Sequence, residues 1–540
     1  GRRTGRGKFF FKNGNKYEGE FWNGVKNGRG KFIYPNGNIY DGEWKDDNRH
    51  GQGTFNYVNG SLYTGEWSNG LIHGYGIYKY SNGDVFEGDF KEGEMHGWGY
   101  YKFKNGNEYH GQWENDKMEG EGIYTSAMGN SYEGYFSDGR LDGPGSFRSY
   151  LGETYVGNWL SGRMHGQGLY VFANGSKYEG EWVYDKRTGY GIYSYANGSI
   201  YEGTFNNGKR NGNGKYKNFN GDIYEGDWID NRMEGQGAYF YENGDTYIGG
   251  WLKDMRHGEG ILSFREGKKY KGSFFQNNIN GNGTMSYSDG QTYIGNWVNG
   301  SMEGEGVYQD LSGNSYEGQW KNNYYHGIGT FKYSNGDVYA GEWINGLRSG
   351  EGTLSKINGD LYKGSWSENK KEGSGTYSTK SGEKYIGLWD NDQRSGKGTQ
   401  IYSNGSEYKG QWRKNIINGF GKMVYSTGGF YEGEWSEGIK SGKGVYVFED
   451  GSRYDGFWVE NSRSGKGKQH FINGNIYDGD WVKDIMQGIG VLSYSNGDIY
   501  DGEWIEGQRN GKGKYTSINE EYSGYWKDGK KEGMGTLTDK

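Results

Sequence analysis

Apolar and polar residues alternate along short stretches of this chain, and turn-forming residues separate the stretches. At residues 17–21 (Tyr-Glu-Gly-Glu-Phe), an extended strand places both rings and the glycine on one face and both glutamates on the other. Residues 28–34 alternate similarly, with two glycines, a Phe and a Tyr on one face. Asn13-Gly14, a strong hairpin-turn signal, precedes the first stretch. The pattern predicts a β-hairpin.

This hairpin pattern recurs with a period of 23 residues. The pentad that begins at Tyr17 returns at Tyr40 and onward to Tyr500, in 22 copies without insertion or deletion, and a last copy begins at Tyr522. Two glycines stand eleven and thirteen positions after the first residue of each pentad. The seventh position after that residue is always Gly, Asp or Asn, which tolerate a positive φ. Each repeat is therefore predicted to be one hairpin with tight turns at both ends.

Hairpins joined by tight turns form an antiparallel meander, so the expected fold is all-β, an elongated single layer of about 24 tandem hairpin repeats. Each repeat advances about 9.6 Å, which gives a strip on the order of 220 Å before twist shortens it. Glycine normally weakens a strand. Its recurrence between aromatic residues indicates that the rings lie over backbone that carries no Cβ, with rows of rings in place of a two-layer core.

The composition narrows the class of protein further. The chain has 107 Gly and only 2 Pro in 540 residues, which excludes a collagen-like structure. Aromatic residues make up 18%, which argues against disorder. There is no Cys and no apolar run long enough for a membrane-spanning helix. The net charge of -7 makes nucleic acid a poor partner. Because the chain begins and ends within the pattern, we expect residues 1–540 to be one continuous array from a longer protein.

The Tyr-x-Gly-x-Trp pentad, the following Gly-x-Gly and the 23-residue period resemble the MORN repeat (membrane occupation and recognition nexus) over residues 1–540. The resemblance implies a twisted single-layer β-structure that serves as a scaffold or partner-binding groove, often in cilia, the cytoskeleton or at membrane contacts. Five pentads end in Phe, which lacks the indole donor. The last turn, residues 519–521, has no glycine, so we expect the last hairpin to be distorted or to cap the array.

Motifs that mimic catalytic or metal sites are better explained by the repeat. The Gly-x-Gly pairs lack the strand-to-helix turn that a phosphate loop needs. Successive repeats would place equivalent histidines roughly 9.6 Å apart, too far to share a zinc ion, and we interpret them as solvated turn residues. They occupy the position before the Gly-x-Gly: His50, His73, His96, His165, His257 and His326. We predict no enzyme activity, no cofactor and no metal site.

The face opposite the rings changes character over residues 247–411. In the flanking repeats, the first and third positions after the pentad tyrosine are often both acidic, whereas here the first position carries mainly Ile and Lys. Two interpretations stay open: drift on a solvated face, or a stripe that binds a partner. The candidates for such a stripe are Ile248, Ile294, Ile386 and Leu388. The alternating lysines would suit an acidic or mixed-charge partner.

These features predict a non-catalytic structural scaffold that presents a long aromatic groove to partner proteins, as part of a large assembly. The candidate contact residues in the groove are Tyr57, Tyr80 and Phe103. The resemblance alone suggests a cytoplasmic, cytoskeletal setting, namely a ciliary axoneme or another microtubule-based assembly. Two alternatives stay open. One is a membrane-contact tether that binds acidic phospholipids, against which the net charge of -7 argues. The other is an accessory module of an enzyme domain outside these residues.

Overall fold

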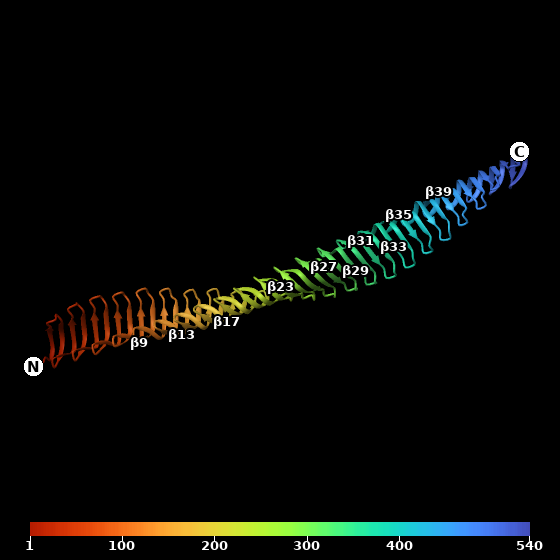
Figure 1. Cartoon of the computed structure of the whole chain (residues 1–540). Helices are drawn as coiled ribbons and strands as arrows, with labels where there is room; N and C mark the ends of the chain where they lie inside the picture. The colour runs from red at the N-terminus through yellow and green to blue at the C-terminus, as the bar shows by residue number, and fades with distance from the viewer. The chain divides into compact units, whose positions relative to one another are not determined.

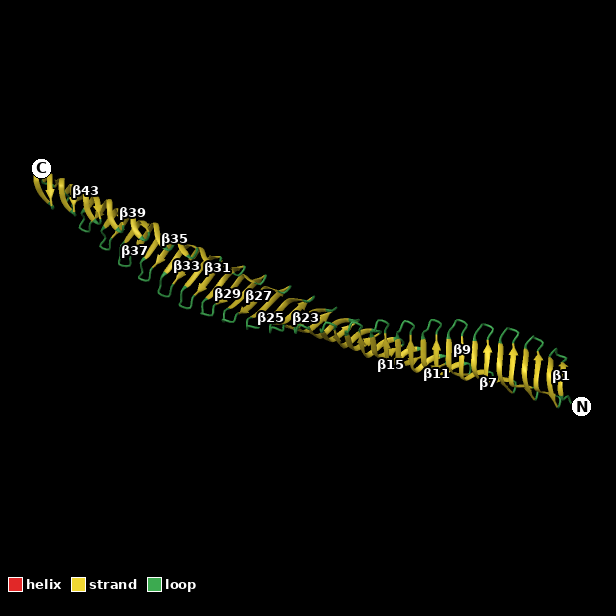
Figure 2. Ribbon diagram, turned by 180° about the vertical axis from the view of Figure 1, so that it is seen from behind, coloured by secondary structure: helices red, strands yellow, loops and turns green.

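A computed structural model describes all 540 residues and shows 47 strands and no helix, so the predicted all-β fold is confirmed (Figure 1). No helix is therefore present that could span a membrane. The chain divides into two units, residues 1–265 with 274–277, and residues 266–273 with 278–540. Within each one, the hairpins follow one another as a single layer, with turns along both edges (Figure 2).

The strands of the first unit are β1 (Gly5–Phe10), β2 (Lys16–Trp22), β3 (Val25–Ile33), β4 (Ile39–Lys45), β5 (Asn48–Asn56), β6 (Leu62–Ser68), β7 (Leu71–Lys79), β8 (Val85–Lys91), β9 (Glu94–Lys102), β10 (Glu108–Glu114), β11 (Lys117–Thr125), β12 (Ser131–Ser137), β13 (Arg140–Arg148), β14 (Thr154–Leu160), β15 (Arg163–Val171), β16 (Lys177–Val183), β17 (Lys186–Ser194), β18 (Ile200–Asn206), β19 (Lys209–Lys217), β20 (Ile223–Ile229), β21 (Arg232–Phe240), β22 (Thr246–Leu252) and β23 (Met255–Ser263).

The boundary between the units falls within β24 (Lys269–Phe275). The strands of the second unit that follow it are β25 (Asn278–Ser286), β26 (Thr292–Val298), β27 (Ser301–Gln309), β28 (Ser315–Lys321), β29 (Tyr324–Lys332), β30 (Val338–Ile344), β31 (Leu347–Ser355), β32 (Leu361–Ser367), β33 (Lys370–Ser378), β34 (Lys384–Asp390), β35 (Gln393–Ile401), β36 (Glu407–Arg413), β37 (Ile416–Val424), β38 (Phe430–Ser436), β39 (Ile439–Val447), β40 (Arg453–Val459), β41 (Ser462–His470), β42 (Ile476–Val482), β43 (Ile485–Ser493), β44 (Ile499–Ile505), β45 (Gln508–Thr516), β46 (Glu520–Lys527) and β47 (Lys530–Asp539).

Each repeat is one antiparallel hairpin, as predicted. In the first, β2 pairs with β3, Tyr17 opposite Phe32 and Gly19 opposite Gly30, and β3 then pairs with β4 of the next repeat. Tyr17 is buried and Glu18 is exposed, because successive side chains of a strand point to opposite faces. We call the side of the sheet that carries the pentad rings the ring face and the opposite side the outer face.

The two glycines of the Gly-x-Gly have different roles, which corrects the expectation that both make room for rings. A Cβ at Gly30 would fall within the ring of Tyr17, so this second glycine is the one over which the ring lies. Gly28 stands at a β-bulge with φ of 92°, and its Cβ would meet the Glu20 side chain of the outer face. A bulge with a left-handed residue reverses the direction of a side chain. The first glycine therefore allows the backbone conformation of the bulge, and the second leaves space for the tyrosine ring.

The turn at the seventh position also joins neighbouring hairpins. Asp47 and Asn231 have φ of 66° and 72°, as the Gly, Asp or Asn pattern predicts. Their side chains do more than tolerate this conformation. The Asn231 side-chain oxygen accepts a hydrogen bond of 2.9 Å from the backbone N–H of Arg210 in the preceding repeat. Asp47 accepts one of 2.8 Å from Lys26 in the same way. The turn residue thus ties each hairpin to the one before it.

We expect Asn231→Ala to lower the free energy of unfolding of this part of the array by about 1–2 kcal/mol. Alanine at a φ of 72° is strained, and the hydrogen bond to Arg210 is lost. Asn231→Gly is the matched control, because Gly70 occupies this position in another repeat with φ of 87°. Urea denaturation and local hydrogen exchange measure both variants. Equal destabilisation by the two substitutions would contradict the strain argument.

Two sequence-based expectations need correction or completion. The histidines that precede the Gly-x-Gly are strand residues rather than turn residues: His50 lies in β5 and His165 in β15, both half-buried beside the bulge. The last hairpin is regular despite its missing turn glycine. Tyr522 lies opposite Leu537 and its hydroxyl donates to the Tyr525 carbonyl at 3.2 Å. A shorter turn, closed by Ser517 N–H and the Glu520 carbonyl at 2.8 Å, replaces the glycine turn.

Candidate partner-binding surfaces

The pentad rings form a ladder along the ring face of each unit. Tyr40 meets Trp44 of its own repeat and Trp67 of the next, each edge to face with ring centroids 5.2 Å apart. The Tyr40 hydroxyl donates to the Glu43 carbonyl at 2.8 Å, and Trp44 Nε1 donates to the Gly30 carbonyl at 2.9 Å. Because their polar atoms are paired and their rings are buried, these residues are structural and present little surface to a partner.

The residue nine positions after each pentad tyrosine covers this ladder, and we call it the covering residue. In many repeats it is a cation: the Arg49 guanidinium lies 4.1 Å from the centre of the Trp67 ring, and its Nη2 donates to the Gly70 carbonyl at 2.5 Å. Five consecutive repeats of the first unit have an apolar covering residue instead: Ile72, Met95, Met118, Leu141 and Met164. The ring face of these repeats therefore lacks positive charge at this position.

Tyr57, Tyr80 and Phe103, the candidates predicted from the sequence, lie on the ring face just beyond the ends of β5, β7 and β9. They are half-buried, and each packs on the last ring of its own strand; the Tyr78 and Tyr80 centroids are 4.3 Å apart. Tyr80 also meets Tyr101 of the next repeat at 5.9 Å. Burial raises the pKa of Tyr57 and Tyr80 above the usual phenol value. These rings form a row beside the apolar covering residues.

On the outer face, the third position after the pentad tyrosine has a structural role that the sequence did not reveal. In several repeats its side chain accepts a hydrogen bond from the backbone N–H between the two glycines of the same hairpin. The Asp227 carboxylate accepts from Gln236 at 2.9 Å, and the Gln319 amide accepts from Ile328 at 3.2 Å. Part of the acidic pattern is therefore a lock across the bulge.

The outer-face candidates are exposed. Ile248, in the first unit, is 54% exposed, and Ile294, in the second, is 55% exposed. Ile386 and Leu388 of β34 line an outer-face groove of the second unit together with Lys363 and Lys397. Apolar side chains beside lysines are the arrangement expected of a stripe that meets an acidic or mixed-charge partner. Binding at these residues stays a prediction.

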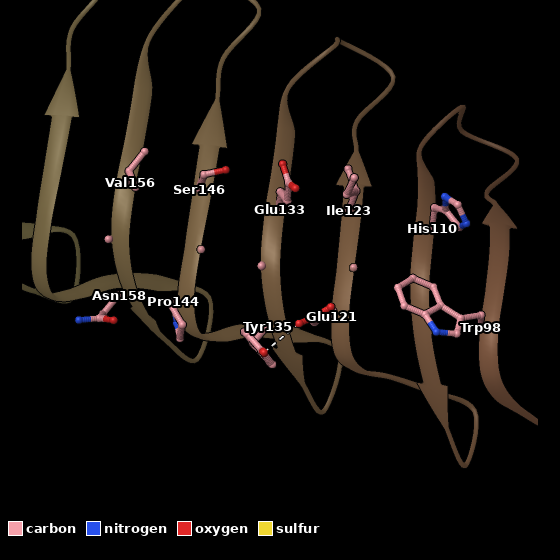
Figure 3. Close-up of a pocket in the computed structure, with 14 residues that line it drawn as sticks. Trp98, His110, Glu121, Ile123, Glu133, Tyr135, Pro144, Ser146, Val156 and Asn158 are labelled. Atoms are coloured by element: carbon pink, nitrogen blue, oxygen red, sulfur yellow. Dashed lines mark hydrogen bonds between the residues drawn. The ribbon is translucent and has the colours of Figure 1, made fainter.

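A second outer-face groove, in the first unit, was not found from the sequence. Two rows of side chains border it, with a floor of glycine backbone between them (Figure 3). One row contains His110, Ile123, Glu133, Ser146 and Val156, and the other contains Trp98, Glu121, Tyr135, Pro144 and Asn158. The groove has a volume of about 720 Å³. Two signals could have indicated it: one of the 2 prolines stands between the glycines of a Gly-x-Gly, and a tyrosine replaces the usual acid or amide.

Comparison with known proteins decides the family. The MORN repeat model matches 24 consecutive segments that run from residue 1 to residue 540. This chain belongs to the MORN repeat family. The recurrent hairpin, its ring ladder and its glycine pair are thus features of a MORN array, a repeat scaffold for protein or membrane binding. A search of curated proteins gave no match.

The solved structures similar to this MORN array resemble it only weakly. The TCP domain of Drosophila melanogaster SAS-4, in complex with a proline-rich motif of Ana2, is 14% identical with a TM-score of 0.19, covering 32% of this chain and 86% of that one. The TCP10 domain of Danio rerio CPAP is 14% identical with a TM-score of 0.18, covering 42% and 96%. A streptogramin B lyase has a TM-score of 0.10. Scores this low carry no argument about this chain.

The buried tyrosines of the MORN array make its stability sensitive to alkali. Burial raises the pKa of Tyr155, Tyr247 and Tyr385 to about 12, against 10.0 for an ordinary phenol. A raised folded-state pKa contributes stability that is complete below the unfolded value and is lost as pH rises through the folded one. We expect unfolding between pH 10 and about 12, with phenolate absorbance rising as the β-sheet circular dichroism is lost. Full phenolate formation with an intact sheet signal would contradict this.

No group of three or more His, Cys, Asp or Glu side chains in the MORN array is placed to hold a metal ion. Some acids at the first position after the pentad tyrosine pair instead with lysines of neighbouring strands: Glu225 with Lys215 at 2.5 Å and Glu432 with Lys422 at 3.3 Å. What the geometry offers is extended surface with rings, aliphatic side chains and charges in regular rows.

Proposed function

We propose that this MORN array is a non-catalytic structural scaffold that presents a long aromatic groove to partner proteins in the cytoplasm, in a ciliary axoneme or another microtubule-based assembly. The observation that carries the binding part of the proposal is the row of half-buried rings at Tyr57, Tyr80 and Phe103 beside apolar covering residues. Rings at regular intervals suit a helix or an extended segment that contacts several repeats at once. The setting is supported by the family alone.

Protein is favoured over lipid as the partner because of charge. A tether that binds anionic phospholipids needs clustered basic residues, whereas the chain carries a net charge of -7 and its covering residues from Ile72 to Met164 are apolar. Co-sedimentation with liposomes of phosphatidylserine and phosphatidylcholine separates the two functions. We expect the array to stay in the supernatant, and binding that depends on phosphatidylserine would favour the membrane tether.

The ring row is tested by replacing Tyr57, Tyr80 and Phe103 together with serine. We expect this triple variant to lose partners that the parent recovers from axonemal extracts, while hydrogen exchange shows the neighbouring repeats folded. The matched control replaces Tyr402, Tyr425 and Phe448, the same residue types at the same repeat position in the second unit. The covering residues of these repeats are Arg394, Ile417 and Lys440, against Arg49, Ile72 and Met95 in the test repeats. Partners retained by the first variant would show that the groove is not the site.

A second partner surface on the outer face is favoured by the exposure of Ile248, Ile294 and Ile386. Changing the three to glutamate restores the acid found at this position in the flanking repeats and leaves the ring face untouched. If this surface binds a partner, the variant loses that partner in the same extracts, since each buried isoleucine contributes roughly 1.5–3 kcal/mol. Recovery of an unchanged set of partners would identify the isoleucines as drift.

A further inference from the structure

One repeat of the first unit, which begins at Tyr132, departs from the ring ladder. Other pentad tyrosines are almost completely buried and donate to the carbonyl three residues on, as Tyr155 does to Asn158 at 2.9 Å. Tyr132 is half-exposed, and its ring packs against Phe147 with centroids 4.7 Å apart. A Cβ at Gly145 would meet Trp159 at 3.2 Å instead of a tyrosine ring, and Trp159 Nε1 is buried without a hydrogen-bond partner.

The outer face of the same repeat lacks the lock across the bulge. Tyr135 replaces the acid or amide that accepts the hydrogen bond, and Pro144 replaces the residue whose N–H donates it. Both halves of one interaction are therefore missing from one hairpin. The Tyr135 hydroxyl donates instead to Glu121 of β11 at 2.9 Å, and its ring, 46% exposed, borders the groove. Gly134, which stands between Glu133 and Tyr135 in the chain, forms part of the glycine floor of the groove.

The shape of this groove defines what it can hold. It runs across the strands from β9 to β14, between the two rows of side chains (Figure 3). Five strand-to-strand steps of about 4.8 Å give a length of about 24 Å, which an extended chain of roughly seven residues spans. Trp98, Ile123 and Val156, between 40% and 59% exposed, supply apolar contact along it. A segment lying across the strands contacts side chains and the glycine floor rather than a sheet edge.

The charge of the groove defines the partner's chemistry. In several other repeats the acid at the position of Glu133 pairs with a lysine of a neighbouring strand, as Asp478 does with Lys468 at 2.9 Å. The residues opposite Glu133 are Ile123 and Ser146, and neither is a cation. A carboxylate between apolar side chains suits an Arg or Lys whose stem lies along the apolar surface while its cation reaches the acid. Exposed Trp98 and Tyr135 rings add faces on which a guanidinium can stack.

We propose that this groove binds an extended segment of a partner protein in which an arginine or lysine is flanked by apolar residues, with the cation on Glu133. The surface lies on the outer face, so it is a second binding site beyond the ring row of the proposed function. The two sites can fail independently, because substitutions in one leave the other unchanged.

The experiment selects random twelve-residue peptides on a display library, using the full chain as bait. We compare the parent with Ser146→Lys, which places a lysine opposite Glu133 within the same hairpin, as Lys215 stands opposite Glu202. Thr330→Lys is the matched control: the same change at the same repeat position, opposite Glu317 and outside the groove. Glu133→Gln, which keeps the size of the side chain, is the second test variant, and circular dichroism confirms that each variant folds.

We expect the parent and Thr330→Lys to enrich the same basic peptides with apolar neighbours, and a synthetic peptide of that sequence to bind both equally. Ser146→Lys and Glu133→Gln should each lower the affinity for that peptide by about tenfold or more, because each removes a charged partner for the cation of the peptide. Enrichment no greater than on an unrelated protein, enrichment without basic residues, or unchanged binding to Glu133→Gln would overturn the proposal. If Ser146→Lys fails to fold, the Glu133→Gln result decides.

Discussion

Gly30→Ala is expected to unfold the first hairpin of the array, with a loss of about 3–5 kcal/mol in its local free energy of unfolding. A Cβ at Gly30 would occupy the space of the Tyr17 ring, whose atoms already lie against the glycine. The ring has no other buried place, because Phe21 and Trp44 hold it edge to face at 4.9 Å and 5.5 Å. Displacing the ring also breaks the hydrogen bond from its hydroxyl to the Glu20 carbonyl.

Gly7→Ala is the matched control, since Gly7 occupies the same repeat position one period earlier and no tyrosine ring covers it. A Cβ at Gly7 would meet only the Phe21 ring, at an ordinary distance of 3.9 Å. Hydrogen exchange of residues 16–33, followed by mass spectrometry, measures both variants. We expect rapid exchange in Gly30→Ala and parent-like exchange in Gly7→Ala. Parent-like protection in Gly30→Ala would contradict the ring-over-glycine account.

Trp458→Ala is expected to destabilise two hairpins together, by about 3–5 kcal/mol. Trp458 is 3% exposed and meets Tyr454 of its own repeat at 5.2 Å and Tyr431 of the preceding repeat at 5.4 Å. Each hairpin depends on its neighbours, so removal of the indole weakens the contact between the two repeats as well as one strand.

Trp458→Phe distinguishes the contribution of ring packing to stability from that of the indole hydrogen bond. Five repeats carry Phe at this position; the substitution keeps a buried aromatic ring of smaller size and removes the bond from Nε1 to the Gly444 carbonyl at 3.2 Å. We expect a loss of about 1 kcal/mol. Urea denaturation and limited proteolysis compare the two variants. Similar losses from Phe and Ala would show that the indole hydrogen bond, rather than ring packing, joins the repeats.

Much of the fold could be predicted because every repeat has the same turn residues and the same alternation of apolar and polar residues. Gly14, and the Gly, Asp or Asn at the seventh position after the pentad tyrosine, indicate turns with positive φ. Alternation at residues 17–21 places the rings on one face. The different roles of Gly28 and Gly30 could not be seen in this way. A bulge changes which face a side chain meets, and residue alternation alone does not locate it.

The candidate sites could be predicted only in part. The row at Tyr57, Tyr80 and Phe103 follows from periodicity, and the structure links these rings through Tyr78 and Tyr101, which lie between them. At the groove beside Glu133, the hydrogen bond that locks the bulge in other hairpins is missing. That hydrogen bond can be recognised only in the three-dimensional structure. Pro144 stands out in the sequence, but the missing hydrogen bond is recognised only when Tyr135 is known to occupy the acceptor position of the same hairpin.

The most direct test of the scaffold account is photo-crosslinking from the ring row. A benzoylphenylalanine replaces Tyr57, Tyr80 or Phe103 in the full chain expressed in ciliated cells, and Lys79, an exposed residue beside Tyr80 that points to the opposite face, is the control. The account predicts one partner protein crosslinked from all three ring positions and not from Lys79. No adduct at the ring positions, or equal adducts from Lys79, would contradict it.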